Sequence, residues 1–351
     1  MKRKIFYSIL ILFIISLAGC IQVNKGKKDP IEKKKEDPIV INYDLSDKRA
    51  ADIDSSFVDH NNEFALKIFK ELLKDEEENV FISPFSISMA LSMALNGANG
   101  ETYNEMRNTL EFDGMTLEEI NSKYLELQKS LEGVDNTLDL NIANSIWIRE
   151  LFEVKQGFKD RNIVYFDSEV YTKDFSNSEI VTEINNWISE ATNGLIEEMI
   201  KEVSPEAMLY LINAIYFKGE WKYQFKPEDT IEKDFHVNGE QAVTVDMMKN
   251  YGDFEFYQDE KLKLLRLPYG RDKVSMYFVQ AEDDLDVLID GMTMEGIEAK
   301  IDNLYITPKL NIEIPKFKVE YGIKELKDAL INLGMEKAFA GADFSNISDT
   351  G

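Results

Sequence analysis

The feature that most constrains the fold is the run from Leu209 to Phe217, in which Asn213 is the only residue that is neither apolar nor aromatic. A strand with one wet face alternates apolar and polar residues, whereas a run without alternation is typical of a strand covered on both faces. We therefore predict a central β-strand at residues 209–217 with other structure packed on each side. Such a strand requires a layered fold with a large core.

A second segment, Phe85 to Leu95, contains only serines besides its apolar residues. A helix that is apolar nearly all round belongs inside a protein. Ser83 and Pro84, directly before it, are typical of a helix N-cap and first turn, and Gly97 is typical of a helix end. We predict a buried helix that starts after Ser83 and is closed by Gly97.

Elsewhere, helix and strand patterns follow one another without regular βαβ repetition, which favours an α+β fold over a doubly wound sheet. No Pro/Gly/Ser-rich linker and no internal repeat interrupts the chain after Phe57, so we expect a single domain at residues 46–351. Helix patterns occupy residues 64–72, 180–191 and 323–333, and strand patterns occupy 138–148 and 310–321, the latter alternating around Pro315. Residues 264–279 resemble a hairpin, and Thr102 with Glu105 resembles a capping box that would open another helix.

The N-terminus resembles a targeting signal. Basic residues 2–4 precede an apolar run, 5–16, which is shorter than the ~20 residues that a membrane-spanning helix needs. The run ends in Leu17-Ala18-Gly19-Cys20, which resembles the lipobox of prokaryotic lipoproteins. We predict a lipoprotein signal peptide at 1–19 and a lipid on Cys20, because the only cysteine of the chain lies at the position that the signal requires. An ordinary secretory signal with an incidental cysteine, or an uncleaved anchor, are the alternatives.

Residues 20–45 are predicted to form a lipidated N-terminus and a charged tether, because they contain the stretch GKKDPIEKKKEDP. A flexible chain of ~25 residues has a root-mean-square reach of about 25–30 Å. The lysines at 33–35 could contact anionic lipid headgroups, although a plain linker is the simpler role. We expect an extracytoplasmic protein held just outside a membrane by its lipid, at the cell surface or in the periplasm.

Composition excludes several classes of function. The chain has 65 acidic and 40 basic residues and a formal charge of −25, which argues against a nucleic-acid partner. One cysteine forms no disulfide framework, and the two histidines, His60 and His236, are far apart in the sequence. The sequence contains no GxSxG, HExxH or P-loop motif, so we predict no metal, no cofactor and no enzymatic activity.

Several motifs resemble those of the serpin family, and their order and spacing agree from about Phe57 to the last residue. The most diagnostic stretch is 213–221, NAIYFKGEW; the segments 79–87, NVFISPFSI, and 97–102, GANGET, also match. Supporting matches are Asn144, Thr192, Gly194, Phe225, Thr230, Phe235-His236-Val237, Met247-Met248, Leu267-Pro268-Tyr269 and Pro315-Lys316-Phe317.

The resemblance implies a serpin-like domain of mixed helices around large, mainly antiparallel sheets, one of which opens to accept a reactive loop as an extra strand. Ser83, Ser86 and Asn213 match the shutter beneath the opening strands, where small hydroxyls and an amide can exchange partners. Trp221 matches the breach, where the loop first enters. By themselves these residues favour simpler roles: a helix cap for Ser83, a satisfied buried amide for Asn213 and core packing for Trp221. None of the four is catalytic in either case.

The resemblance implies a suicide-substrate inhibitor of serine endopeptidases, or of cysteine proteases, that is monomeric when complete. Residues 342–351 resemble the turn that leads into the next central strand of a serpin. The strand with the shutter histidine, the hinge, the reactive loop and the closing strands are not found in the sequence, so we assign no reactive-site bond and expect the domain to be incomplete at its C-terminus. The alternative is a non-inhibitory surface lipoprotein that uses the scaffold for binding.

Overall fold

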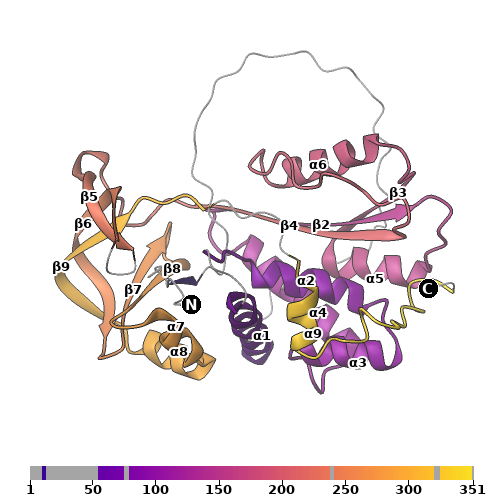
Figure 1. Cartoon of the computed structure of the whole chain (residues 1–351), viewed down its shortest axis with the longest axis horizontal. Coiled ribbons are helices and arrows are strands. Elements are labelled where there is room, and N and C mark those ends of the chain that lie inside the picture. Colours follow the sequence, from indigo (N-terminus) through magenta and orange to yellow (C-terminus); the bar gives the residue numbers. More distant parts are fainter. Residues whose placement is uncertain (1–9, 13–53, 75–78, 238–240, 320–324, 350–351) are drawn as a thin grey trace, which may run out of the picture.

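The computed structural model describes residues 10–12, 54–74, 79–237, 241–319 and 325–349 (Figure 1). Cys20 and the predicted tether lie outside these residues. The helices are α1 Ser55–Leu73, α2 Pro84–Leu95, α3 Gly100–Thr109, α4 Leu117–Glu132, α5 Gln156–Phe166, α6 Glu179–Ala191, α7 Leu285–Asp290, α8 Met294–Asp302 and α9 Lys327–Asn332, with a 3₁₀ turn at Pro227–Asp229. The strands are β1 Leu10–Leu12, β2 Asp139–Arg149, β3 Ser168–Lys173, β4 Leu209–Lys218, β5 Ile231–Val237, β6 Gln241–Gln258, β7 Leu262–Tyr269, β8 Val274–Ala281 and β9 Tyr305–Pro315.

The predicted strand at 209–217 is confirmed as β4, in a sheet of order β3-β2-β4. β2 runs parallel to β3 and antiparallel to β4, and Asn144 lies opposite Asn213. Helix α6 covers one face and α2 lies on the other (Figure 1), which explains why the strand needs no polar side. The expected central position is not observed among the described residues, because β4 is there the last strand of its sheet.

A second sheet has the order β1-β8-β7-β6-β5, and β9 also pairs with β6. The long β6 pairs with β5 at one end and with β7 at the other, and the register of its pairing with β9 shifts between Gly252 and Phe254. The predicted hairpin at 264–279 is confirmed as β7 and β8. Strand β1 pairs with β8 and falls within the segment for which we predict a cleaved signal, so cleavage would remove it.

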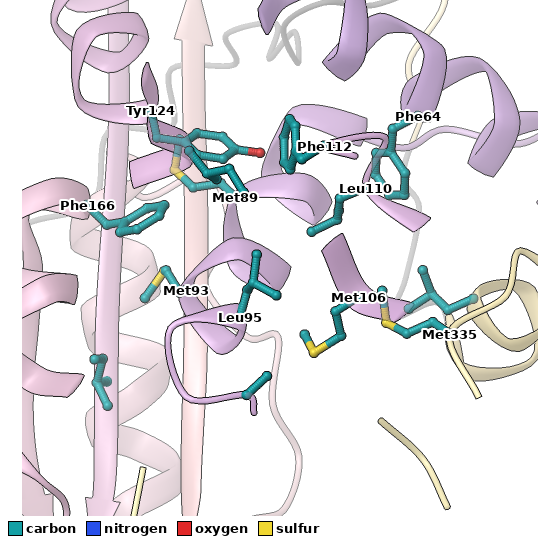
Figure 2. Packing of buried hydrophobic residues seen from close by; sticks show 14 of the residues in the cluster. Phe64, Met89, Met93, Leu95, Met106, Leu110, Phe112, Tyr124, Phe166 and Met335 are labelled. Carbon is teal, nitrogen blue, oxygen red and sulfur yellow. The ribbon is translucent and has the colours of Figure 1, made fainter. Parts of the chain in front are cut away.

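The main core lies between the helices and the β3-β2-β4 sheet (Figure 2). Met89 and Met93 of α2 are fully buried there, beside Tyr124 of α4 and Phe166 of α5. The predicted buried helix is therefore confirmed, and even its serines at 88 and 92 are at most 1% exposed. Burial of each large apolar side chain contributes roughly 1.5–3 kcal/mol, so α2 fixes the position of the sheet above it.

The predicted capping box at Thr102 and Glu105 is wrong. Helix α3 starts at Gly100, and Thr102 is buried inside it, where its hydroxyl accepts a hydrogen bond of 2.9 Å from the backbone N–H of Asp343. A capping box is formed instead by Thr116 and Glu119 at the start of α4. The local pattern of Thr102 and Glu105 therefore predicted a helix cap, but the hydroxyl of Thr102 is used by a hydrogen bond from Asp343, far away in the sequence.

Candidate strand-accepting site at beta4

In the side-chain amide of Asn213, the nitrogen has hydrogen-bond partners, whereas the oxygen is buried and has none among the described residues. Its Nδ2 donates to Oδ1 of Asn144 at 2.8 Å and lies 3.3 Å from the sulfur of Met89. Its Oδ1 is buried and accepts no hydrogen bond from any described residue. A buried acceptor without a donor costs about 1–3 kcal/mol of stability. Asn213 is therefore not the fully hydrogen-bonded buried amide that was the simpler expectation for this position.

Asn144 determines which way the Asn213 amide points. Its own Nδ2 donates to the carbonyl of Phe166 at 2.7 Å and approaches Oε1 of Gln128 at 3.4 Å. This leaves Oδ1 of Asn144 facing Asn213, and only the nitrogen of Asn213 can serve it. Asn144 is 2% exposed, so the arrangement is sheltered from competing water. The free acceptor of Asn213 is therefore a consequence of the whole network.

Ser83 and Ser86 lie together at the start of α2. Oγ of Ser83 accepts a hydrogen bond of 2.9 Å from the hydroxyl of Ser86 and a weaker one of 3.4 Å from its backbone N–H. Ser83 is thus the N-cap of α2, as predicted. Met89, which contacts Asn213, belongs to the same helix. The three predicted shutter residues thus belong to two elements that pack together, α2 with its N-cap and β4, but no hydrogen bond between described residues joins Asn213 to either serine.

Trp221 lies just beyond the end of β4, apart from the shutter residues. Its ring stacks on that of Tyr269 with centroids 4.3 Å apart, and the two residues form an isolated β-bridge. Phe225 and Phe278 complete an aromatic cluster around it. The hydroxyl of Tyr269 is buried and has no hydrogen-bond partner within the described segments, and its burial raises the pKa of Tyr269. Trp221 therefore joins the end of β4 to the β7–β8 hairpin.

Backbone hydrogen bonds fasten the same junction. The N–H of Lys222 donates to the carbonyl of Pro268, and the N–H of Gly270 donates to the carbonyl of Glu220, both at 2.9 Å. Oδ2 of Asp135 accepts a hydrogen bond of 2.6 Å from the N–H of Arg271. Asp135 precedes β2 and belongs to no recognisable motif, so the sequence alone did not indicate its role. The local feature nearest to it is Gly270 in the hairpin turn, where a β-carbon would overlap the side chains of Thr137 and Asp135.

The described residues hold neither a metal-binding cluster nor a membrane-spanning helix. Among them, no group of three or more His, Cys, Asp or Glu residues is placed to hold a metal ion. In the same part of the chain, none of the helices combines the length and the apolar character that crossing a bilayer demands.

Comparison with known proteins agrees with this geometry. Residues 59–351 match the family model described as serpin (serine protease inhibitor). The chain belongs to the serpin family. Ipis-1 of Ixodes persulcatus is 34% identical over 311 residues, which cover 85% of this chain and 81% of the relative. An uncharacterized serpin-like protein of Methanosarcina acetivorans is 30% identical over 363 residues, covering 99% of this chain and 82% of the relative.

Among solved structures, emu ovalbumin superposes on this serpin with a TM-score of 0.80 and 26% identity, over 84% of this chain and 82% of the other. The predicted α+β serpin fold is thereby confirmed. As a family, serpins inhibit serine proteases and are largely secreted, although some members are not inhibitors. The roles of Ser83, Ser86, Asn213 and Trp221 stay predictions.

Proposed function

We propose that this serpin inhibits serine endopeptidases by accepting a cleaved reactive loop as a new strand beside β4. The observation that carries the proposal is the buried Oδ1 of Asn213, which has no partner among the described residues and lies on β4, the last strand of its sheet in that part of the chain. An edge strand is a template for another strand, and each added ladder bond contributes about 0.5–1.5 kcal/mol. A donor on the incoming structure would also relieve the orphaned acceptor.

In this proposal the protein side of the inhibition is mechanical. The target protease cleaves the loop and forms the acyl-enzyme with its own nucleophile, and strand addition then carries the protease away from its starting position. Ser83, Ser86 and Asn213 act as the shutter because their short polar side chains can change hydrogen-bond partners while strands separate. Trp221 acts at the breach, at the end of β4.

The test begins with the coding sequence downstream of the codon for Gly351. We expect it to encode a histidine-containing strand and a hinge of small residues, and a downstream sequence with neither would contradict an inhibitory role for this gene. The extended product, incubated with trypsin-, chymotrypsin- and subtilisin-like proteases, should form a denaturant-resistant covalent complex. A protease whose catalytic serine is replaced by alanine is the matched control and should form none.

Cleavage of the extended product without a covalent complex would favour the alternative, a non-inhibitory lipoprotein that uses the scaffold for binding. We infer that the complete protein is a monomer, because an added strand would cover the edge of β4 that otherwise invites association with another chain. Analytical ultracentrifugation of the extended product would test this, and a stable dimer at micromolar concentration would contradict it.

We further propose that the protein is anchored outside the cytoplasm through a lipid on Cys20. The lipobox-like sequence Leu17-Ala18-Gly19-Cys20 and the charged residues that follow support this proposal. Bacteria that express the full chain and are fed a labelled fatty acid should yield a labelled membrane protein. Cys20→Ser should abolish the label and release the protein, whereas the control Asn24→Ser should leave both unchanged. An unlabelled, freely secreted wild-type protein would instead indicate an ordinary secretory signal.

A further inference from the structure

Met208, directly before β4, differs from the other methionines of the described residues in its exposure. Its side chain is 45% exposed. The others are buried, at positions 89, 93, 106, 247, 276, 292 and 335, or half-buried, at positions 115, 199, 248 and 294. Oxidation of a methionine to its sulfoxide requires that the oxidant can reach the sulfur. In the described part of the chain, Met208 is therefore the methionine that an oxidant in solution reaches most readily.

Arg149, the last residue of β2, binds the segment that leads into β4. Its backbone N–H donates to the carbonyl of Met208 at 3.0 Å. This bond extends the β2–β4 pairing one residue beyond Ile148 and Leu209. The guanidinium of Arg149 donates from Nη1 to the carbonyl of Pro205 at 3.1 Å and from Nη2 to the sulfur of Met208. Arg149 thus holds both the backbone and the side chain of the exposed methionine.

Oxidation of Met208 would give Arg149 a stronger acceptor. A thioether sulfur is a weak acceptor of hydrogen bonds, whereas a sulfoxide is polar and its oxygen accepts a charge-assisted hydrogen bond from a guanidinium. Arg149 is only half-buried, so its guanidinium can shift to meet an oxygen added to the sulfur. The guanidinium also stays charged throughout the pH range in which proteins fold. The oxidised side chain therefore has a partner already beside it.

The oxidation itself needs a peroxide as co-reactant. A lone pair of the Met208 sulfur attacks the terminal oxygen of the peroxide, the S–O bond forms and the O–O bond breaks. The departing oxygen takes up the proton of the transferred oxygen and leaves as an alcohol, or as water when the oxidant is hydrogen peroxide. Sulfur loses two electrons and the peroxide gains two.

We propose that Met208 is an oxidation site whose sulfoxide is bound by Arg149, so that a peroxide tightens the start of β4 against β2. Oxidation of a buried methionine has the opposite effect, because a polar oxygen disrupts apolar packing. The exposure of Met208 avoids that cost, and Arg149 supplies the donor. This proposal does not depend on strand acceptance beside β4, since it concerns only the pairing of β4 with β2.

The experiment treats the full chain, solubilised in mild detergent, with hydrogen peroxide and follows every methionine by peptide mass spectrometry. We expect Met208 to be oxidised at least about 10-fold faster than the fully buried Met89 and Met93. Protein that carries one added oxygen is then isolated, and hydrogen exchange at the amide of Arg149 is compared with that of untreated protein. A charge-assisted bond in place of the weak contact should slow this exchange by about 5-fold.

Two variants separate binding by Arg149 from oxidation alone. Met208→Leu keeps an apolar side chain of similar size that cannot be oxidised, so peroxide should leave exchange at Arg149 unchanged. Arg149→Gln keeps the sulfur but lacks the cation, so peroxide should not slow exchange at residue 149. The matched control is Met294→Leu, which removes a half-buried methionine in α8 and should respond to peroxide as the wild type does.

Met208→Gln keeps the test independent of whether Arg149→Gln folds. It places an amide oxygen close to the position of the sulfoxide oxygen, and it should slow exchange at Arg149 without peroxide. Oxidation of Met208 no faster than that of Met89 would refute the oxidation site. Unchanged or faster exchange at Arg149 after oxidation of Met208, or equal slowing in Arg149→Gln, would refute the binding of the sulfoxide by Arg149.

Discussion

Truncation of the two paired asparagines, Asn144 and Asn213, should have unequal costs although the same atoms are removed. Asn144→Ala takes away the acceptor for Nδ2 of Asn213 and the donor to the carbonyl of Phe166. Asn213→Ala leaves Oδ1 of Asn144 without its donor, but it also removes an acceptor that was already orphaned. The first change removes a hydrogen-bond partner from two buried groups, the Phe166 carbonyl and Nδ2 of Asn213, and leaves that Nδ2 only its weak contact with the sulfur of Met89. The second change replaces one unpaired acceptor by another.

At about 1–3 kcal/mol for each buried polar group left unpaired, Asn144→Ala should lower the free energy of unfolding by about 3 kcal/mol. Asn213→Ala should lower it by about 1 kcal/mol, mainly through lost packing around Met89. The double variant Asn144→Ala/Asn213→Ala should be no less stable than Asn144→Ala alone. In the single variant Nδ2 of Asn213 has lost its acceptor, and the second substitution removes that donor.

The assay is urea unfolding followed by tryptophan fluorescence, with each variant compared at an unchanged slope. The exposed Asn108 is the control, and Asn108→Ala should change the free energy of unfolding by no more than about 0.5 kcal/mol. Equal losses for Asn144→Ala and Asn213→Ala would mean that Oδ1 of Asn213 is satisfied in solution. That result would remove the observation on which strand acceptance rests.

Three further predictions concern other parts of the fold. Gly97→Ala should lower the free energy of unfolding by about 1–3 kcal/mol in urea titrations, because a β-carbon at Gly97 would overlap the side chain of Ile347; a neutral effect would show that the C-terminal segment yields. Tyr269→Phe should leave the melting temperature unchanged or raise it, since the buried hydroxyl has no partner, and a loss above about 1 kcal/mol would reveal a hidden one. Lys233 holds the pKa of Glu313 below its ordinary value, so the stability that this carboxylate contributes is present above pH 4.5 and is lost as the pH falls through the lowered pKa. Thermal melts of wild type and Glu313→Gln should therefore converge below pH 4, and a constant difference would contradict this cause.

Local signals in the sequence predicted α2 and β4, because such signals depend only on residues that are neighbours in the chain. The apolar run at 209–217 predicted β4, and Ser83 with Pro84 predicted the start of α2. The same kind of signal failed at Thr102, where a hydrogen bond from the distant Asp343 displaced the expected cap. Resemblance to serpin motifs identified Asn213 and Trp221 as candidates, but it did not reveal the state of either side chain.

The sequence by itself determined the buried helix α2, the strand β4, the β7–β8 hairpin, the α+β class and the family, because periodicity, turn residues and motif order are properties of a linear chain. Only the tertiary structure decided that Asn144 turns the amide of Asn213 so that its oxygen is left unpaired. It also decided that Asp272 joins Lys222 to Arg266, since these residues come from segments that only the fold brings together. Whether a polar group is satisfied depends on burial and on every neighbour in space, and no local pattern encodes either.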